Sequence, residues 1–270
     1  MQELTRPQFA LTRTLFRDIP YLRSVVFSNL DGPQYGRVFV ERIPDPAAAM
    51  IWSDAVYFAG SPANTNFNQA LKRFVVEEVF PQKEHLLFYP FDTLRDTVLM
   101  DLFQEYGITH ITRTGFHFDP AIFQERHHGW RAHIPAGYSV LSVDGAVGRD
   151  NPNTHQGITD LWGKLEIFLE HGVGYVVMHE GQVVSSCLSV FVGDGHAEMG
   201  LNTDEAFRCG GLATLAACAF IEECLQRGLV PDWQCFYNPP SEHLALKLGF
   251  VDKTEMRIPY LHVLESFFKP

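Results

Sequence analysis

The sequence predicts a mixed α/β fold of the α+β class, in which a mostly antiparallel mixed sheet is flanked by helices. Some β-rich segments are joined by tight turns. For example, Gly193-Asp194-Gly195 separates the segments 182–192 and 197–203, a pattern that is typical of hairpins. Others are separated by helices that end at a glycine, such as 92–106 before Gly107. Strands are therefore expected to pair both through hairpins and across helices.

The composition limits the classes of function. The chain has 270 residues, of which 46% are hydrophobic, so one or two domains with a sizeable core are expected. Its net charge of −11, without a basic run, argues against a nucleic-acid partner. An apolar run of about 18 residues, which would span a membrane, is missing, and so is a signal-peptide core. We therefore expect a cytoplasmic protein with no membrane partner.

Five cysteines lie in the last third of the chain, and none forms a Cys-x-x-Cys pair. This pattern indicates reduced thiols rather than disulfides or zinc ligands. His127, His128 and His133 lack a carboxylate or cysteine at a useful spacing, so exposed histidines are favoured over a metal site. Cys209 lacks an adjacent base, which disfavours a covalent nucleophile. We expect no metal.

Elements in the first half follow from hydrophobic periodicity and turn residues. A helix is expected over 11–29, with a break near Pro20. Then follow strands over 36–43, 48–52 and 55–59, a helix over 64–79 capped by Asn64 or Thr65, a strand over 85–89, a helix over 92–106 and a strand over 108–118.

The second half repeats this order with an additional strand, which indicates two similar domains, 1–130 and 131–270, joined by a linker near 125–135. Its predicted elements are strands over 139–143, 174–179, 182–192, 197–203, 233–237 and 251–260, and helices over 160–171, 212–228 and 241–248.

A glycine-rich turn, Arg208-Cys209-Gly210-Gly211-Leu212-Ala213-Thr214, lies between a predicted strand and an apolar helix. Unpaired backbone N–H groups at the positive end of a helix bind phosphate, and small side chains let phosphate oxygens approach. An ordinary tight turn is the alternative. The equivalent turn of the first half, 60–64, contains Pro62, which removes a donor, so only the second half is expected to bind a phosphate-bearing cofactor.

This turn, the preceding Glu198-Met199-Gly200-Leu201-Asn202-Thr203 and the later Lys247-Leu248-Gly249-Phe250 resemble the GCN5-related N-acetyltransferase (GNAT) superfamily. Pro231-Asp232-Trp233-Gln234-Cys235 and Gly36-Arg37-Val38-Phe39-Val40 are among the segments that resemble the subgroup containing the zwittermicin A resistance protein. The resemblance implies a full GNAT domain in the C-terminal half. It also implies a degenerate GNAT-like domain, without the cofactor loop, in the N-terminal half.

The resemblance further implies that acetyl-CoA (coenzyme A) lies where the strand before the loop splays from its neighbour. Backbone groups of Leu201 and Thr203 would pair with the pantetheine arm, and Arg208 would act by fixing the loop or by its charge. N–H groups from Cys209, Gly210, Gly211, Leu212, Ala213 and Thr214 would hold the pyrophosphate, and Asn238 and Ser241 would lie near the thiol.

The implied reaction transfers an acetyl group to an amine, which must first lose a proton. Glu198 is the candidate base, because partial burial on its strand would raise its pKa; a structural carboxylate is the alternative. The backbone N–H near Leu201 is expected to stabilise the oxyanion. Many relatives carry a Tyr that protonates the thiolate, but the matching position here is Ala245, so the general acid is unassigned.

These observations predict an acetyl-CoA-dependent N-acetyltransferase, an acyltransferase that acts on a small-molecule amine, such as an antibiotic or a metabolite, by direct attack in a ternary complex. The alternative is a non-catalytic acyl-CoA-binding or regulatory protein. A dinucleotide oxidoreductase is disfavoured because the chain lacks Gly-x-Gly-x-x-Gly. A homodimer is left open.

Overall fold

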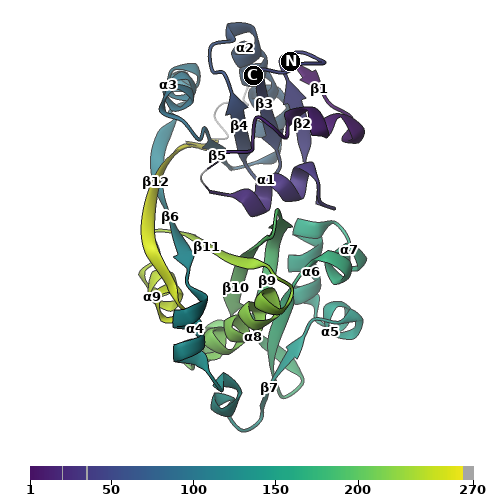
Figure 1. The fold of residues 1–270 in the computed structure, drawn as a ribbon, viewed down its shortest axis with the longest axis vertical. Coiled ribbons are helices and arrows are strands. Elements are labelled where there is room, and N and C mark those ends of the chain that lie inside the picture. The colour runs from purple at the N-terminus through teal and green to yellow at the C-terminus, as the bar shows by residue number, and fades with distance from the viewer. Residues whose placement is uncertain (20, 35, 264–270) are drawn as a thin grey trace. The chain divides into compact units, whose positions relative to one another are not determined.

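The computed structural model describes residues 1–19, 21–34 and 36–263. The chain forms two compact units (Figure 1). Unit 1 contains the described residues within 1–31, 35–113 and 256–270, and unit 2 contains residues 32–34 and 114–255. Each unit therefore takes a piece of chain from the opposite half of the sequence. None of the described helices is long and apolar enough to cross a membrane.

Unit 1 is built on a mixed sheet. Its strands, in spatial order, are β1 (Gln2–Glu3), β2 (Arg37–Val40), β3 (Ala48–Trp52), β4 (Val56–Gly60), β5 (His85–Tyr89) and the end of β12 (Phe250–His262). Neighbouring strands are antiparallel except β4 and β5, which pair in parallel across the helix α2 (Thr65–Phe74). After α3 (Thr93–Leu102) the chain enters β6 (Thr109–Phe118), whose first residues belong to unit 1 and whose last belong to unit 2.

The helices of unit 1 begin where the sequence offers side-chain caps. The Asn64 side chain accepts a hydrogen bond from the Phe67 N–H, and the Asp92 side chain accepts one from the Arg95 N–H. The first turn of α2 thus has a donor satisfied by its own cap. Helix α2 continues into the π-helical turn η2 (Val75–Val79) and the 3-10 turn η3 (Phe80–Gln82).

The long N-terminal helix predicted over 11–29 is wrong in its middle. The structure has a 3-10 helix, η1 (Arg6–Thr12), then turns, and only then α1 (Arg23–Leu30). Leu22, just before α1, has a φ of 64°, a left-handed conformation that a continuous helix cannot contain. Pro20, where a break was predicted, lies outside the described residues.

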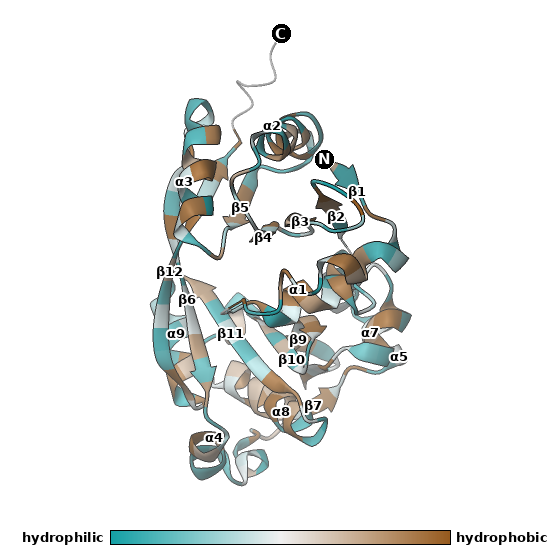
Figure 2. Cartoon of the chain, turned by 45° about the horizontal axis from the view of Figure 1, so that its top comes forward, coloured by the Kyte–Doolittle hydropathy of each residue, from teal (hydrophilic) through white to brown (hydrophobic). Residues whose placement is uncertain are grey.

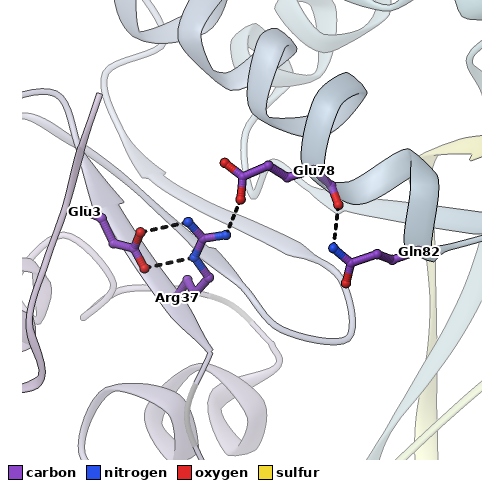
Figure 3. Close-up of polar contacts among 4 residues, drawn as sticks. All are labelled: Glu3, Arg37, Glu78 and Gln82. Atoms are coloured by element: carbon purple, nitrogen blue, oxygen red, sulfur yellow. Dashed lines mark hydrogen bonds and ion pairs between the residues drawn. The ribbon is translucent and has the colours of Figure 1, made fainter.

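Arg37 links three elements of unit 1 (Figure 3). Its guanidinium donates from Nε and Nη2 to both carboxylate oxygens of Glu3 on β1, at 2.8 and 2.7 Å, and from Nη1 to Glu78 in η2. The backbone carbonyl of Glu78 in turn accepts from Gln82 Nε2 at 2.7 Å. The Arg37 hydrogen bonds lower the pKa of the Glu3 carboxyl, outweighing partial burial.

Unit 2 contains a second mixed sheet. Its strands, in spatial order, are β6, β11 (Val230–Phe236), β10 (His196–Thr203), β9 (Gln182–Gly193), β8 (Gly174–His179) and β7 (Tyr138–Ser142). The strands β7 to β10 form antiparallel pairs, and β10 and β11 are parallel. Its helices are α4 (Pro120–His127), α5 (Gly145–Asp150), α6 (Pro152–Trp162), α7 (Leu165–His171), α8 (Leu212–Gln226) and α9 (Pro239–Lys247), with 3-10 turns η5 (Trp130–His133) and η6 (Glu205–Phe207).

Helices cover both faces of the unit 2 sheet. The largely apolar α8 (Figure 2) packs in one core cluster with Cys187 and Ala197, whereas α6 and α7 pack with Leu188 in another. Successive residues of a strand point to opposite faces, so α8 and α6 lie on opposite sides of β9. The face that bears α8 is called the α8 face below, and the other is called the α6 face.

Two segments of unit 2 differ from the expected elements. The helix predicted over 160–171 is divided at Gly163, whose φ is 71°, into α6 and α7, and most of α6 was not predicted. The segment expected as a linker holds the end of α4 and the turn η5. Its Trp130 is buried in the α8 core and donates to Glu222 at 2.8 Å. The boundary expected between residues 130 and 131 thus falls inside unit 2.

Candidate functional site

The parallel strands β10 and β11 pair only at their beginnings. His196, Ala197 and Glu198 are register partners of Val230, Pro231 and Asp232, and no further pairing of these strands occurs in the described part of the chain. On its other edge β10 stays paired with β9 as far as Thr203. Residues 199–203 therefore present an open strand edge, to which an extended molecule can hydrogen-bond.

The glycine-rich loop follows β10 and leads into α8. Gly211 is the N-cap of α8, with a φ of 78° and no side-chain cap. Within the described residues, the N–H groups of Gly211, Leu212 and Ala213 donate no hydrogen bond. A Cβ added at Gly211 would meet nothing within 4 Å. Unsatisfied donors at the start of a fifteen-residue helix, in open space, fit the phosphate groups expected here.

Arg208 holds this loop against β10. Its Nε donates to the carbonyl oxygen of Thr203 at 3.1 Å, which closes the turn between the strand and the helix. Of the two roles expected for Arg208, the fixing of the loop is therefore supported by a direct contact. The same contact occupies the carbonyl oxygen of Thr203. A pantetheine arm that pairs with Thr203 would therefore use the Thr203 N–H group or share this carbonyl oxygen with Arg208.

The equivalent turn in unit 1 is closed by side chains. Arg95, fully buried on α3, donates from Nη2 to the carbonyls of Gly60 and Ser61, at 3.2 and 2.8 Å. Its Nη1 donates to Asn68 Oδ1 at 3.3 Å, and Asn64 caps α2. An arginine thus binds carbonyl groups in both turns, but the first helical turn of α2 has a side-chain cap and that of α8 has none.

Glu198 lies on β10 at the point where its pairing with β11 ends. Only 6% of its surface is exposed. Its neighbours Ala197 and Met199 belong to the α8 core, so the Glu198 side chain lies on the α6 face. Its register partner Asp232 accepts a hydrogen bond through Oδ1 from Nδ1 of the His196 ring at 2.9 Å. Two carboxylates and an imidazole thus gather on one face.

A cavity of about 230 Å³ lies between α6 and the α6 face of β9 and β10. Its walls mix polar residues with apolar ones, and Asp204 is the ionisable residue among them. A Cβ added at Gly157, on α6, would lie 3.9 Å from Leu188 Cδ1, so a larger side chain there would extend into the cavity. The lining comprises Asn153, Thr154, Gly157 and Leu161 of α6, Val183, Val184, Ser185, Ser186, Leu188 and Val190 of β9, Gly200, Leu201 and Asn202 of β10, and Asp204.

Comparison with known proteins identifies the family of this chain. The sequence pattern of the GNAT acetyltransferase family matches residues 13–258. The chain belongs to the GNAT acetyltransferase family. A Bacillus subtilis (strain 168) relative, described as uncharacterized N-acetyltransferase YdfB, is 31% identical over 264 residues, which is 96% of this chain and 98% of the relative.

Solved structures show the same GNAT fold. A GCN5-related N-acetyltransferase-like protein from Streptococcus suis superposes with a TM-score of 0.67 at 24% identity, over 94% of this chain and 98% of that one. A tandem GNAT protein from the clavulanic acid biosynthesis pathway superposes with a TM-score of 0.59 at 13% identity, over 96% and 95%. The predicted fold class is confirmed, and acetyl-CoA is the co-substrate of the family. The narrower likeness to the zwittermicin A resistance subgroup stays a prediction.

The remaining residues predicted for the GNAT site have local partners in unit 2. Asn238 caps α9 by accepting from the Ser241 N–H at 3.3 Å, and Ser241 Oγ accepts from Trp233 Nε1 at 3.2 Å. Their place beside the thiol stays a prediction. Ala245, at the position of the usual Tyr, is fully buried, whereas Tyr237 is 83% exposed. The general acid therefore stays unassigned.

The thiols of unit 2 differ in environment. Cys187, Cys218 and Cys224 are buried, and burial raises the pKa of each, for Cys218 to about 12. These thiols stay protonated at neutral pH. Cys209, in the glycine-rich loop, is exposed and has a φ of 63°. The described residues contain no group of three potential metal ligands, and His127 instead bonds the carbonyl of Lys247 at 2.9 Å.

The α6 side of the site was missed in the sequence. An available signal was Asn151-Pro152, because proline is favoured at the first position of a helix, where α6 has it. The residues that follow, including Asn153 and Thr154, are polar and short, which is typical of a loop. Packing of Ile158 and Trp162 against β9 holds this segment as a helix.

Proposed function

We propose that the protein is an acetyl-CoA-dependent N-acetyltransferase that acts on a small primary amine. The open edge of β10 beside the uncapped start of α8 carries this proposal, because the two features offer donors for an extended arm and for a pyrophosphate. The acceptor amine would occupy the cavity between α6 and β10. Its volume of about 230 Å³ favours a compact molecule over a peptide segment.

Acetyl-CoA supplies the acetyl group as an activated thioester. Glu198 would remove the proton of the attacking ammonium group, directly or through water, while the Leu201 N–H would donate to the carbonyl oxygen as it gains charge. The new bond joins the amine nitrogen to the acetyl carbon, and the bond from that carbon to sulfur breaks. No residue is assigned as the acid that protonates the leaving thiolate. A thiolate is a tolerable leaving group near neutral pH.

The charge of the site favours a cationic acceptor. Asp204 lines the cavity, Glu198 lies on the same face of the sheet, and the whole chain carries a net charge of −11. Carboxylates around a concave site raise the local concentration of cations. A protonated amine is therefore the expected form in which the acceptor arrives.

The cofactor site is tested by Gly211→Glu. A carboxylate at this position would meet the pyrophosphate with bulk and like charge, so acetyl-CoA binding measured by calorimetry should be abolished. Gly181→Glu is the matched control: Gly181 has a φ of 79°, against 78° for Gly211, and a Cβ there also meets nothing within 4 Å. Backbone strain is thus equal in the two variants. Undiminished affinity in Gly211→Glu would refute the assigned site.

A non-catalytic acyl-CoA-binding protein is the second candidate, favoured by the buried Ala245 where relatives carry a Tyr. The two candidates differ in turnover. Thiol release from acetyl-CoA should be measured with a panel of amino alcohols, amino sugars and arylalkylamines. Release that depends on one of the amines supports the transferase. Tight acetyl-CoA binding with no release across the panel supports the binding protein.

A further inference from the structure

A β-bulge in β9 lies directly opposite Glu198. Ala197 is the register partner of Val192 and Met199 is the partner of Ser189, so Val190 and Phe191 of β9 face Glu198 alone. A bulge leaves backbone groups of the bulged strand without ladder partners. Buried groups of this kind need other hydrogen bonds, because an unsatisfied one costs about 1–3 kcal/mol.

The side chain of Gln34 hydrogen-bonds the backbone of β9 at this bulge. Gln34 is 4% exposed and belongs to unit 2, although it comes from the first half of the sequence. Its Nε2 donates to the carbonyl oxygen of Val190 at 2.7 Å, and its Oε1 accepts from the Val192 N–H at 3.4 Å. A carboxamide carries one carbonyl and one N–H₂ group, so it replaces the peptide group that a regular strand would offer here.

The same amide reaches helix α6. Nε2 also lies 3.4 Å from the carbonyl oxygen of Leu161, near the end of that helix. Leu161 and Val190 line opposite walls of the cavity. A Cβ added at Gly200 would lie 2.8 Å from Val190 Cγ2, so Val190 also packs closely over β10. Gln34 therefore joins the helical wall of the cavity to the bulge that faces Glu198.

We infer that Gln34 is a positioning residue, whose carboxamide sets the bulge of β9 and the spacing of the acceptor cavity beside Glu198. Its effect on acetyl transfer rests on the proposed function, whereas its hold on the bulge does not. The orientation of the amide is fixed by its partners, because two carbonyls require the nitrogen and an N–H group requires the oxygen. Displacement of a reacting group by about 1 Å costs up to roughly a hundredfold in rate.

The first test reads the bulge itself and needs no substrate. Gln34→Met keeps the length of the side chain and removes both polar groups. We expect hydrogen exchange of the Val192 N–H to accelerate by about tenfold or more. Gln34→Glu keeps an acceptor for Val192 but sets a carboxylate against two carbonyl oxygens, so protection should be lost at pH 7 and return toward wild type as acid protonates that carboxylate. Exchange at Val192 that is unchanged in both variants would overturn the inference.

The second test reads the cavity, with the amine from the panel that gives the highest rate of thiol release. In Gln34→Met we expect the KM for this amine to rise about tenfold, while the KM for acetyl-CoA stays within about twofold. A structural role alone would instead lower the active fraction and leave the amine KM unchanged, which would contradict the inference. Gly157→Leu fills the cavity directly, so it should raise the amine KM without changing exchange at Val192.

Gln156→Met is the control for loss of a glutamine amide. Gln156 is an exposed residue of α6 whose amide bonds Asp160, and neither measurement should change in this variant. If wild type acetylates no amine of the panel, the proposed function fails, and exchange at Val192 decides the role of Gln34 by itself. The two failures are therefore distinguishable.

Discussion

Glu198 combines deep burial with a place at the last paired position of β10 and β11. Burial of a carboxylate disfavours its charged form unless neighbours stabilise it, and groups of this kind concentrate at functional sites. Its face of the sheet also bears His196 and Asp232, which bond each other. We propose that the Glu198 carboxyl group gains and loses a proton during the reaction.

Replacement of Glu198 by Gln is the prediction at this scale. Glutamine has the shape of glutamate but cannot accept the ammonium proton, so we expect kcat to fall by about a hundredfold while the KM for acetyl-CoA is unchanged. Stopped-time assays of thiol release with the best amine of the panel would measure both constants. Glu205→Gln, on the exposed turn η6, is the control. An unchanged kcat in Glu198→Gln would assign the proton to water and leave Glu198 a structural role.

Local residues of the site were predictable from the sequence, and distant partners were not. Gly210 and Gly211 stand out because a glycine pair directly before an apolar helix is typical of a loop that binds phosphate. Gln34 gives no such signal: it contacts Val190 across 156 positions of sequence, and it lies in a segment without periodicity. The backbone groups of Val190 and Val192 that the Gln34 amide bonds come within its reach only in the folded protein.

Among the elements of unit 1, the short strand β1 is attached to β2 by backbone pairing and by one charged contact. Arg37 bonds both oxygens of Glu3 and also bonds Glu78, so a two-residue strand and the turn η2 are attached to β2. Bidentate guanidinium–carboxylate pairs are among the stronger exposed contacts, although exposed pairs contribute at most about 1 kcal/mol. The element is therefore sensitive to one substitution and to acid.

Arg37→Met should lower the free energy of unfolding by about 1 kcal/mol at pH 7, or Tm by about 2 °C. The pKa of Glu3 is lowered in the folded state from an ordinary value of 4.5, so its contribution is present above that value and is lost as pH falls through the folded pKa. Thermal unfolding should show the Tm difference at pH 7 and a smaller one at pH 3.

Arg73→Met provides the comparison, because Arg73 is an exposed arginine of α2 with no ion pair among the described residues. Its Tm should match wild type at both pH values. A Tm difference for Arg37→Met that persists undiminished at pH 3 would mean that the contact of the Arg37 guanidinium with the rings of Phe39 and Phe74 causes the effect rather than its pairing with Glu3.

Elements were predictable where periodicity and caps agree. Helices α2 and α3 and the strands β8 to β10 lie close to their expected positions, because Asn64, Asp92 and the glycine turns mark their ends. The N-terminal helix failed because spacing at 11–29 mimics a helix, whereas Leu22 adopts a left-handed conformation that sequence spacing does not record. Tertiary packing decides such segments.

At the scale of the whole molecule, two units share the order strand, helix, strand around a parallel pair, yet their turns are built differently. Unit 2 leaves donors open at the start of α8. Unit 1 caps α2 with Asn64 and binds the carbonyls of Gly60 and Ser61 with Arg95. The duplicated order was predictable from the sequence, and so was the asymmetry, because Pro62 already removes a donor from the first turn.

One acetyl-CoA per chain is therefore the expected stoichiometry, because among the described residues α2 has a side-chain cap at its first turn, whereas α8 has none. Calorimetric titration should give a single class of sites with a ratio near one. Gly211→Glu should remove this binding completely rather than by half. Residual binding in that variant, or a ratio near two, would show that the turn held by Arg95 also accepts the cofactor.

The exchange of chain segments between the units was not predictable, because a repeated order of elements favours a contiguous division of the chain. The structure instead completes the sheet of unit 1 with β12, whose residues Tyr260, Leu261 and His262 pair with Leu87, Leu86 and His85 of β5. This pairing has a consequence for synthesis. During translation β5 emerges long before its partner, so one edge of its strand stays exposed until residues 260–262 have left the ribosome. The first unit to be made is thus the last that can be finished.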